Sequence, residues 1–155
     1  MPLNGSLIYT EGKALEYGGI NLFDENAYLL SLFGRVGGGL EVGVDLQSDM
    51  AFIEWGGLRA TYGSLVPSDE KTMVLCLDLH VANYPQMNIE LLGVAAGQRP
   101  QAIGALRLES LEDGSVDLIL YADQVLTLKA DEDTRLLASM LGFLEDSLEN
   151  LVLPD

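Results

Sequence analysis

The last third of the chain predicts a strand followed by one long amphipathic helix. Residues 116–121 form a short apolar run of the kind found in buried strands. Asp131 is a candidate N-cap, and the two residues after it are acidic, which favours the positive end of a helix dipole. Apolar residues then recur at helical spacing on one broad stripe, namely Leu136, Leu137, Met140, Leu141, Leu144, Leu148 and Leu151.

The middle of the chain changes to a period of two, which is typical of strands with one buried face. Apolar residues alternate with polar or small ones over 40–46, and two further apolar segments follow at 50–55 and 58–62. Turn-forming residues separate the segments, including Gln47-Ser48-Asp49 and Gly56-Gly57. We therefore predict three short antiparallel strands joined by tight turns.

A short first helix is predicted over residues 22–34. Either Asn21 or Asp24 could cap it, and Gly34 could end it. Residues 1–20 are interpreted as a small hairpin turning at Glu11-Gly12 or as a loosely held arm.

The choice between helix and strand stays open in the second half. The almost continuous apolar run over 73–84 predicts a second helix, because residues 67–70 (PSDE) resemble a helix start. A buried strand competes with that prediction, since periodicity does not separate the two here. Residues 89–97 are apolar and ambiguous. A strand over 102–108, joined by a turn at 112–114 to the strand at 116–121, completes the pattern.

Together these elements predict an α+β fold in a single domain over residues 1–155. It is an antiparallel sheet of about five strands with helices packed on it. The predicted order is helix, three strands, helix, two strands, helix.

Charge narrows the classes of partner. The 155 residues include 24 acidic and 8 basic ones, for a formal net charge of −16. Nucleic acid and an anionic membrane surface are therefore disfavoured, because both require clustered Lys and Arg. A solvated acidic surface is the simplest interpretation of this charge, and attraction for a basic partner is the alternative. With one cysteine, Cys76, and no visible signal peptide, we expect a cytoplasmic protein without an internal disulfide.

Candidate chemical groups do not form a catalytic or metal-binding pattern, and we expect neither enzymatic activity nor a cofactor. Cys76 and His80 would share one face of a helix, but a small buried thiol beside a half-exposed imidazole explains them better. A zinc site needs more Cys and His than the chain has. The glycines at 37–39 lack the Lys and Ser or Thr of a phosphate-binding loop.

The order of elements, the length, the acidity and the lone cysteine resemble the class I type III secretion chaperones, the Tir-chaperone-like family. The segment 114–128 followed by 136–144 is similar to that family's strand and closing helix. The segment 75–84, ending in Ala82-Asn83-Tyr84, looks like its second helix. The resemblance covers residues 20–152 as a pattern of elements.

This resemblance implies a small acidic homodimer, without enzymatic activity, that binds an extended segment of an effector or other partner protein along exposed sheet edges. Partner contacts would lie on the three middle strands, and our candidates are Leu40, Val42, Val44, Phe52, Ile53 and Trp55. The second helix and the strand at 116–121 would form the dimer interface, with candidates Leu75, Leu79, Leu118 and Leu120.

Two other classes of function remain open. One is a small acidic ligand-binding α+β protein or enzyme with a pocket between sheet and helices; a deep apolar pocket with polar groups near His80 would favour it. The other is an immunity or anti-activator type of protein whose acidic face blocks a basic partner.

Overall fold

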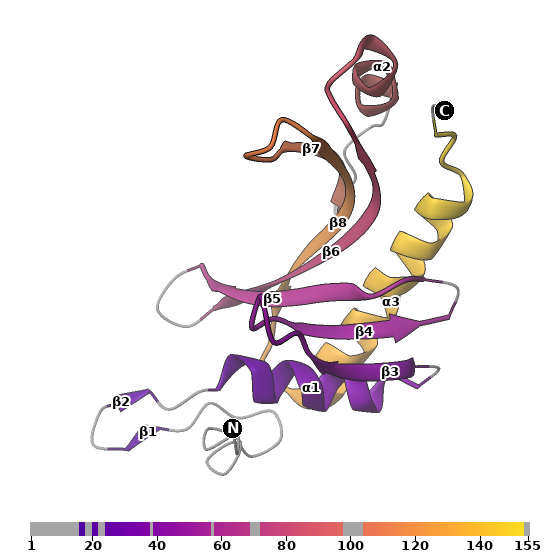
Figure 1. The fold of residues 1–155 in the computed structure, drawn as a ribbon. Coiled ribbons are helices and arrows are strands. Elements are labelled where there is room, and N and C mark those ends of the chain that lie inside the picture. Colours follow the sequence, from indigo (N-terminus) through magenta and orange to yellow (C-terminus); the bar gives the residue numbers. More distant parts are fainter. Residues whose placement is uncertain are drawn as a thin grey trace.

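The structure is a computed structural model, and it describes residues 16–17, 20–21, 24–37, 39–56, 58–68, 72–97 and 104–153. Its main element is one strongly curved antiparallel sheet with two helices on the same side (Figure 1). The elements are, in chain order, β1 (Glu16–Tyr17), β2 (Ile20–Asn21), α1 (Glu25–Arg35), β3 (Gly39–Val44), β4 (Ala51–Trp55), β5 (Thr61–Pro67), β6 (Met73–Tyr84), α2 (Ile89–Gly97), β7 (Gly104–Ser110), β8 (Val116–Leu126) and α3 (Ala130–Glu149).

Six strands form the large sheet in the order β3-β4-β5-β6-β8-β7. Strands β3 to β6 follow one another as an antiparallel meander, and the hairpin β7–β8 then joins the free side of β6 through β8. Strand β6 is therefore shared by the meander and the hairpin. The α+β class predicted from the sequence is confirmed, with six strands in the large sheet and three helices among the described residues.

Helices α1 and α3 cover the two parts of the sheet on one face. Helix α1 packs on β3, β4 and β5, and α3 packs on β8 and β6 as well as on α1. Of the two predicted caps of the first helix, Asn21 and Asp24, the structure has Asp24, whose side chain accepts a hydrogen bond from the Ala27 backbone amide at 3.0 Å. Gly34 lies inside that helix instead of ending it, and the C-cap is Val36.

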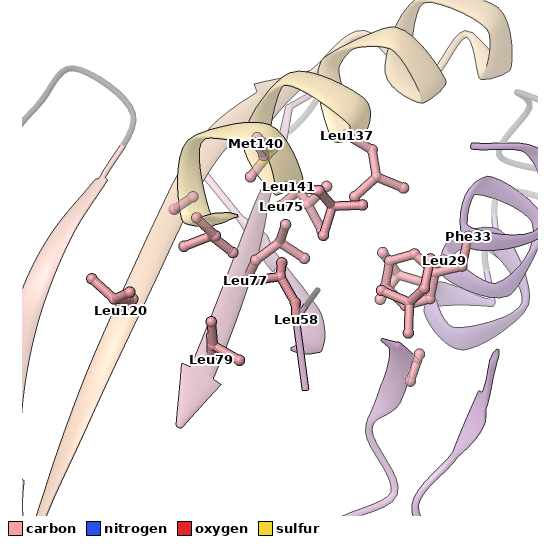
Figure 2. Close-up of a cluster of buried hydrophobic side chains, with 14 of the residues drawn as sticks. Leu29, Phe33, Leu58, Leu75, Leu77, Leu79, Leu120, Leu137, Met140 and Leu141 are labelled. Atoms are coloured by element: carbon pink, nitrogen blue, oxygen red, sulfur yellow. The ribbon is translucent and has the colours of Figure 1, made fainter. Parts of the chain in front are cut away.

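The hydrophobic core lies between these two helices and the sheet (Figure 2). Every second residue of a strand points to the helices and is buried, as Leu75, Leu77 and Leu79 of β6 show. Gly63 of β5 gives α1 room to approach, since a Cβ atom there would lie 3.0 Å from Cζ of Phe33. Helix α3 contributes the predicted apolar stripe, of which Leu137, Met140, Leu141 and Leu144 are buried.

The prediction of a helix over 73–84 is wrong, because these residues form β6, the longest strand. Every second residue from Leu75 to Val81 is buried, so the segment has the period of a half-buried strand. The second helix falls instead on the ambiguous segment and is α2. Pro67 likewise ends β5 instead of starting a helix.

Smaller differences concern element ends. The strand predicted over 58–62 begins at Thr61, and the N-cap of α3 is Lys129 instead of Asp131. The predicted turn at Glu11-Gly12 lies outside the described residues, and β1 pairs with β2 as a separate two-stranded sheet. Within the described part of the chain, no helix combines the length and the apolar composition that a bilayer crossing requires.

Candidate partner-binding face

The face of the large sheet opposite α1 and α3 is called the open face here. Successive residues of a strand point to opposite faces, and the neighbours of Phe52, Ala51 and Ile53, are buried under the helices, so Phe52 points to the open face. Residues that pair with each other in the ladder share a face. One row across the sheet pairs Phe52 of β4 with Tyr62 of β5, Tyr62 with Asp78 of β6, and Asp78 with Tyr121 of β8. Thus aromatic and charged side chains from four strands meet on this face.

A pocket of about 390 Å³ opens on this face beside the turn between β3 and β4. This volume is within the range of small-ligand sites. Its lining combines two carboxylates, an imidazole, a phenol, a thioether and a hydroxyl, supplied by Asp45, Asp78, His80, Tyr62, Met50 and Ser48.

Asp45 organises the rim of the pocket. Its carboxylate accepts hydrogen bonds from the backbone amides of Gln47 at 2.7 Å and Ser48 at 3.2 Å, and from the Tyr62 hydroxyl at 3.0 Å. The two backbone bonds, with that of Tyr62, lower the pKa of Asp45, so it is ionised at neutral pH. The bond to Asp45 raises the pKa of Tyr62, which keeps the phenol protonated.

Asp78 is fixed from the opposite side of the pocket by Arg107 of β7. The guanidinium donates two hydrogen bonds, at 3.0 and 2.8 Å, to the two carboxylate oxygens. This bidentate pair crosses over β8, where the Arg107 guanidinium lies 5.3 Å from the ring centroid of Tyr121. The salt bridge raises the pKa of Arg107, which carries its charge at any relevant pH.

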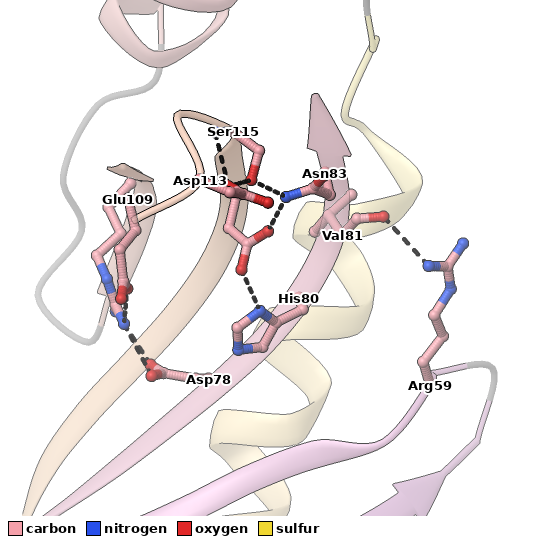
Figure 3. Close-up of polar contacts among 10 residues, drawn as sticks. Arg59, Asp78, His80, Val81, Asn83, Glu109, Asp113 and Ser115 are labelled. Carbon is pink, nitrogen blue, oxygen red and sulfur yellow. Dashed lines mark hydrogen bonds and ion pairs between the residues drawn. The ribbon is translucent and has the colours of Figure 1, made fainter. Parts of the chain in front are cut away.

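His80 belongs to a polar chain at the upper end of β6 (Figure 3). Its Nδ1 lies 3.2 Å from a carboxylate oxygen of Asp117, whose other oxygen accepts a bond from the Asn83 amide at 2.6 Å. Asn83 also donates to the Ser115 hydroxyl at 3.2 Å, and Ser115 donates to Asp113. The ring nitrogen of His80 that faces Asp117 is therefore Nδ1, and Nε2 takes no part in this contact.

A β-bulge changes the register of β6 next to His80. Ile119 faces His80 and Leu118 faces Ala82, so Val81 has no counterpart on β8. The Val81 carbonyl instead accepts a bond from Arg59 at 3.3 Å. Because of the bulge, His80 and Asn83, which are three residues apart, lie on the same face of the sheet, and both contact Asp117.

Cys76 does not pair with His80. Both lie on the open face of β6, but four strand residues separate their Cα atoms by about 13 Å. Burial, together with the nearby Asp123, raises the pKa of the Cys76 thiol to about 11. The thiol is therefore protonated at neutral pH, and it is partly buried and away from His80, where the sequence predicts a buried thiol beside the imidazole.

Two carboxylates lie directly opposite each other at the edge of the face. Glu41 of β3 pairs with Glu54 of β4 in the ladder. A hydrogen bond between the two side chains, together with partial desolvation, raises the pKa of Glu54. Like charges directly opposite each other destabilise a strand pair, so the Glu41–Glu54 pair lowers the stability of the fold.

The sheet ends in two strands, β3 and β7, that have a ladder partner on one side only within the described residues. An edge strand presents unpaired backbone donors and acceptors, which can pair with another chain. The open face is thus bounded on both sides by edges that can accept an added strand.

The candidate partner contacts are divided between the two faces. Of the six, Phe52 lies on the open face, where its ring rests on Gly43 of the neighbouring strand. Ile53 is fully buried in the core, and Val42 and Trp55 pack against that core. Val44 is half-buried on the same side, and the side chain of Leu40 lies outside the described part. The Trp55 indole also donates to the Gly37 carbonyl at 2.7 Å.

The four candidates for a dimer interface are all buried within the single chain. Leu75, Leu79, Leu118 and Leu120 are at most 1% exposed, because they point to the helices. They have no surface to offer a second copy, so the dimer interface predicted from the resemblance has to be corrected. For Leu75 and Leu79 the error follows from the helix predicted at 73–84, whereas Leu118 and Leu120 lie on the side of β8 that α3 covers.

Of the residues that line the pocket, only His80 is named in the sequence-based expectation of a pocket. A signal existed in β6, where Cys76, Asp78 and His80 alternate with buried leucines and so mark a polar face. Asp45 and Tyr62 could be found only from the register that brings their strands together. In the described part of the chain, no three His, Cys, Asp or Glu residues are grouped to hold a metal ion.

Comparison with known proteins identifies a structural neighbour but no family. No protein-family model and no curated protein match the chain. Among solved structures, YbjN from E. coli, described as a proposed transcription regulator, matches with a TM-score of 0.51. The two chains are 11% identical, and the match covers 85% of this chain and 97% of the other. The likeness shows a shared fold. It does not identify the chain as a secretion chaperone.

Proposed function

We propose that this protein is a non-enzymatic, chaperone-type protein that binds an extended segment of a partner polypeptide. The observation that carries the proposal is the open face between the edge strands β3 and β7. A polypeptide added to either edge gains backbone hydrogen bonds, and its alternate side chains reach the open face. The resemblance to the type III secretion chaperones points to the same mode of binding, with an effector as the partner.

Acidity supports a protein partner over nucleic acid. The chain carries a net charge of −16, and the open face includes many carboxylates, namely Glu41, Asp45, Glu54, Asp78, Glu109, Asp117 and Asp123. Phosphate backbones are repelled by such a face. If this protein shares a regulatory role with its structural neighbour, it acts by binding a protein, which is the anti-activator type of function.

A homodimer in the cytoplasm is part of the proposal. The family resemblance puts the dimer interface on the second helix, which here is α2. Ile89 and Leu92 of α2 are 83% and 51% exposed, so this helix has apolar surface for a second copy to cover. Light scattering behind a sizing column tests this, with twice the mass of 16.8 kDa expected for the wild type and a monomer for Ile89→Asp with Leu92→Asp.

The binding test uses a library of random 12-residue peptides, selected against the purified immobilised protein. Selected peptides are synthesised with a fluorophore, and their affinity is measured by anisotropy. Hydrogen exchange of the complex then locates the contact. We expect slower amide exchange in β3 or β7 on binding, because an added strand pairs with the edge. Failure to enrich any peptide, or protection confined to the helices, would contradict the proposal.

A second candidate function is binding of a small molecule in the pocket beside His80. The volume of about 390 Å³ and the converging carboxylates and imidazole favour it. A screen for thermal stabilisation by small metabolites tests this candidate. A hit that shifts the resonances of Tyr62 and His80 would favour it over polypeptide binding.

A further inference from the structure

The pocket beside the β3–β4 turn is matched to a cation. Asp45 and Asp78 both line it, and neither lysine nor arginine lines it among the residues that the structure describes. Both carboxylates are held in position by hydrogen-bond donors, Asp45 by the backbone amides of its own turn and Asp78 by Arg107, which does not line the pocket. Acceptors that are already oriented bind a cation without having to be ordered first.

Acceptor capacity remains after these contacts. An ionised carboxylate offers about four lone-pair positions. Three donors reach Asp45, and the guanidinium of Arg107 uses two positions of Asp78. The imidazole of His80 lines the same pocket, and its Nδ1 is engaged by Asp117.

The remaining walls suit a planar cation. Tyr62 lines the pocket, with Phe52 at 5.9 Å and His80 at 6.4 Å between ring centroids. A guanidinium stacks on aromatic rings and pairs with carboxylates in a bidentate way, whereas an ammonium does so less well. Met50 supplies a polarisable apolar contact for the methylene stem.

The pocket also adjoins an edge. Asp45 directly follows β3, and its backbone amide continues the β3–β4 pairing through a bond to the Met50 carbonyl at 2.9 Å. A strand added to β3 would run about 4.8 Å from it. Its side chains on the open face would therefore reach the pocket beside Asp45.

We propose that this pocket receives a basic side chain of the bound partner segment, arginine in preference to lysine. The inference rests on the polypeptide-binding function proposed above and specifies the residue that the partner must carry. The positive charge of Arg107 weakens the attraction of the pocket for a basic side chain, but this charge is already paired with Asp78. Asp45 in the pocket and Asp117 beside His80 keep the surroundings negative.

The test uses small probes, so that it does not depend on having identified a partner. Nα-acetyl-arginine methylamide, the lysine analogue and the neutral citrulline analogue are titrated into ¹⁵N-labelled full-length protein. We expect saturable shifts at residues 45–50, Tyr62, Asp78 and His80 with arginine, weaker ones with lysine and none with citrulline. Asp45→Asn should weaken arginine binding about tenfold, which is the loss of one charge-assisted contact.

Asp146→Asn is the matched control, because it removes the same charge from an exposed position on α3. Equal weakening by both variants, or equal shifts with arginine and citrulline, would overturn the proposal in favour of nonspecific attraction. The peptide selection separates the two proposals. If selected peptides contain no basic residue and bind Asp45→Asn as well as the wild type, the polypeptide-binding function stands and the arginine site is refuted. If the arginine probe binds but no peptide is selected, the proposed binding of a partner segment is refuted, and the pocket is a site for a free organic cation.

Discussion

Tyr28 of α1 donates a hydrogen bond to the buried carboxylate of Asp133 in α3, 105 residues further along the chain. Asp133 is fully buried and also accepts bonds from the Thr127 amide at 2.9 Å, the Thr127 hydroxyl at 3.0 Å and the Leu128 amide at 2.9 Å. One carboxylate thus joins α1, the end of β8 and the start of α3. The same contacts hold Leu128 at its positive φ of 64°.

Tyr28→Phe should lower the free energy of unfolding by about 1–3 kcal/mol, because a buried carboxylate loses one of its donors. Urea unfolding followed by circular dichroism measures the change. Tyr121→Phe is the matched control on the open face and should change stability by less than about 0.5 kcal/mol. Equal effects of the two variants would show that the hydrogen bond between Tyr28 and Asp133 does not stabilise the folded protein.

Gly63→Ala should destabilise the protein by about 1–3 kcal/mol, because the new methyl group would crowd Phe33 in a packed core. Gly142→Ala, in the middle of α3, should instead stabilise it by about 1 kcal/mol, since nothing lies within 4 Å of the added Cβ. Thermal or urea unfolding compares the two. If Gly63→Ala is neutral or stabilising, α1 does not approach β5 as closely as described.

Glu54→Gln should raise stability at pH 7, because it removes the repulsion with Glu41. The pKa of Glu54 is raised above its ordinary value of 4.5, so its contribution is favourable below that value and is lost as the pH rises through the folded-state pKa. The gain from the substitution should therefore disappear below pH 4.5. Unfolding curves between pH 3 and 8 measure it, and a gain that does not depend on pH would contradict the raised pKa of Glu54.

Cys76 should react with iodoacetamide roughly a hundredfold more slowly than an unperturbed thiol at pH 8, because its pKa is about 11 instead of 9.0. Asp123→Asn should speed the reaction by lowering this pKa, although desolvation, the larger cause, remains. Mass spectrometry of the alkylated protein gives the rates. Reaction at the ordinary thiol rate in the folded protein would contradict this environment.

The sequence predicts the parts of this fold whose pattern is local. The α3 stripe and the Asp24 cap depend on neighbours a few residues apart, and both are found. The long apolar run at 73–84 favours a helix by its composition, whereas the alternation of Leu75, Leu77 and Leu79 with more polar residues favours a strand. The buried side of β6 packs on the helices, and its polar side faces away from them, so period two was the decisive pattern.

The candidate site is less predictable because it is assembled by pairing between distant strands. Tyr62 reaches Asp45 across 17 residues and Arg107 reaches Asp78 across 29. A shift of one residue in any ladder would send one partner to the core. Spacing along the chain therefore carries little information about which carboxylates meet.

Strand β6 belongs to both parts of the sheet, and this makes the protein a natural two-piece assembly. A cut after Gln86, in the exposed link before α2, would give one fragment with α1 and the β3–β6 meander, and a second with α2, β7, β8 and α3. Each fragment alone would expose one side of the longest pairing in the sheet, β6 with β8, and half of the core. We expect the two fragments to restore the folded protein when refolded together and to aggregate when refolded apart, so the chain offers a site for fragment complementation.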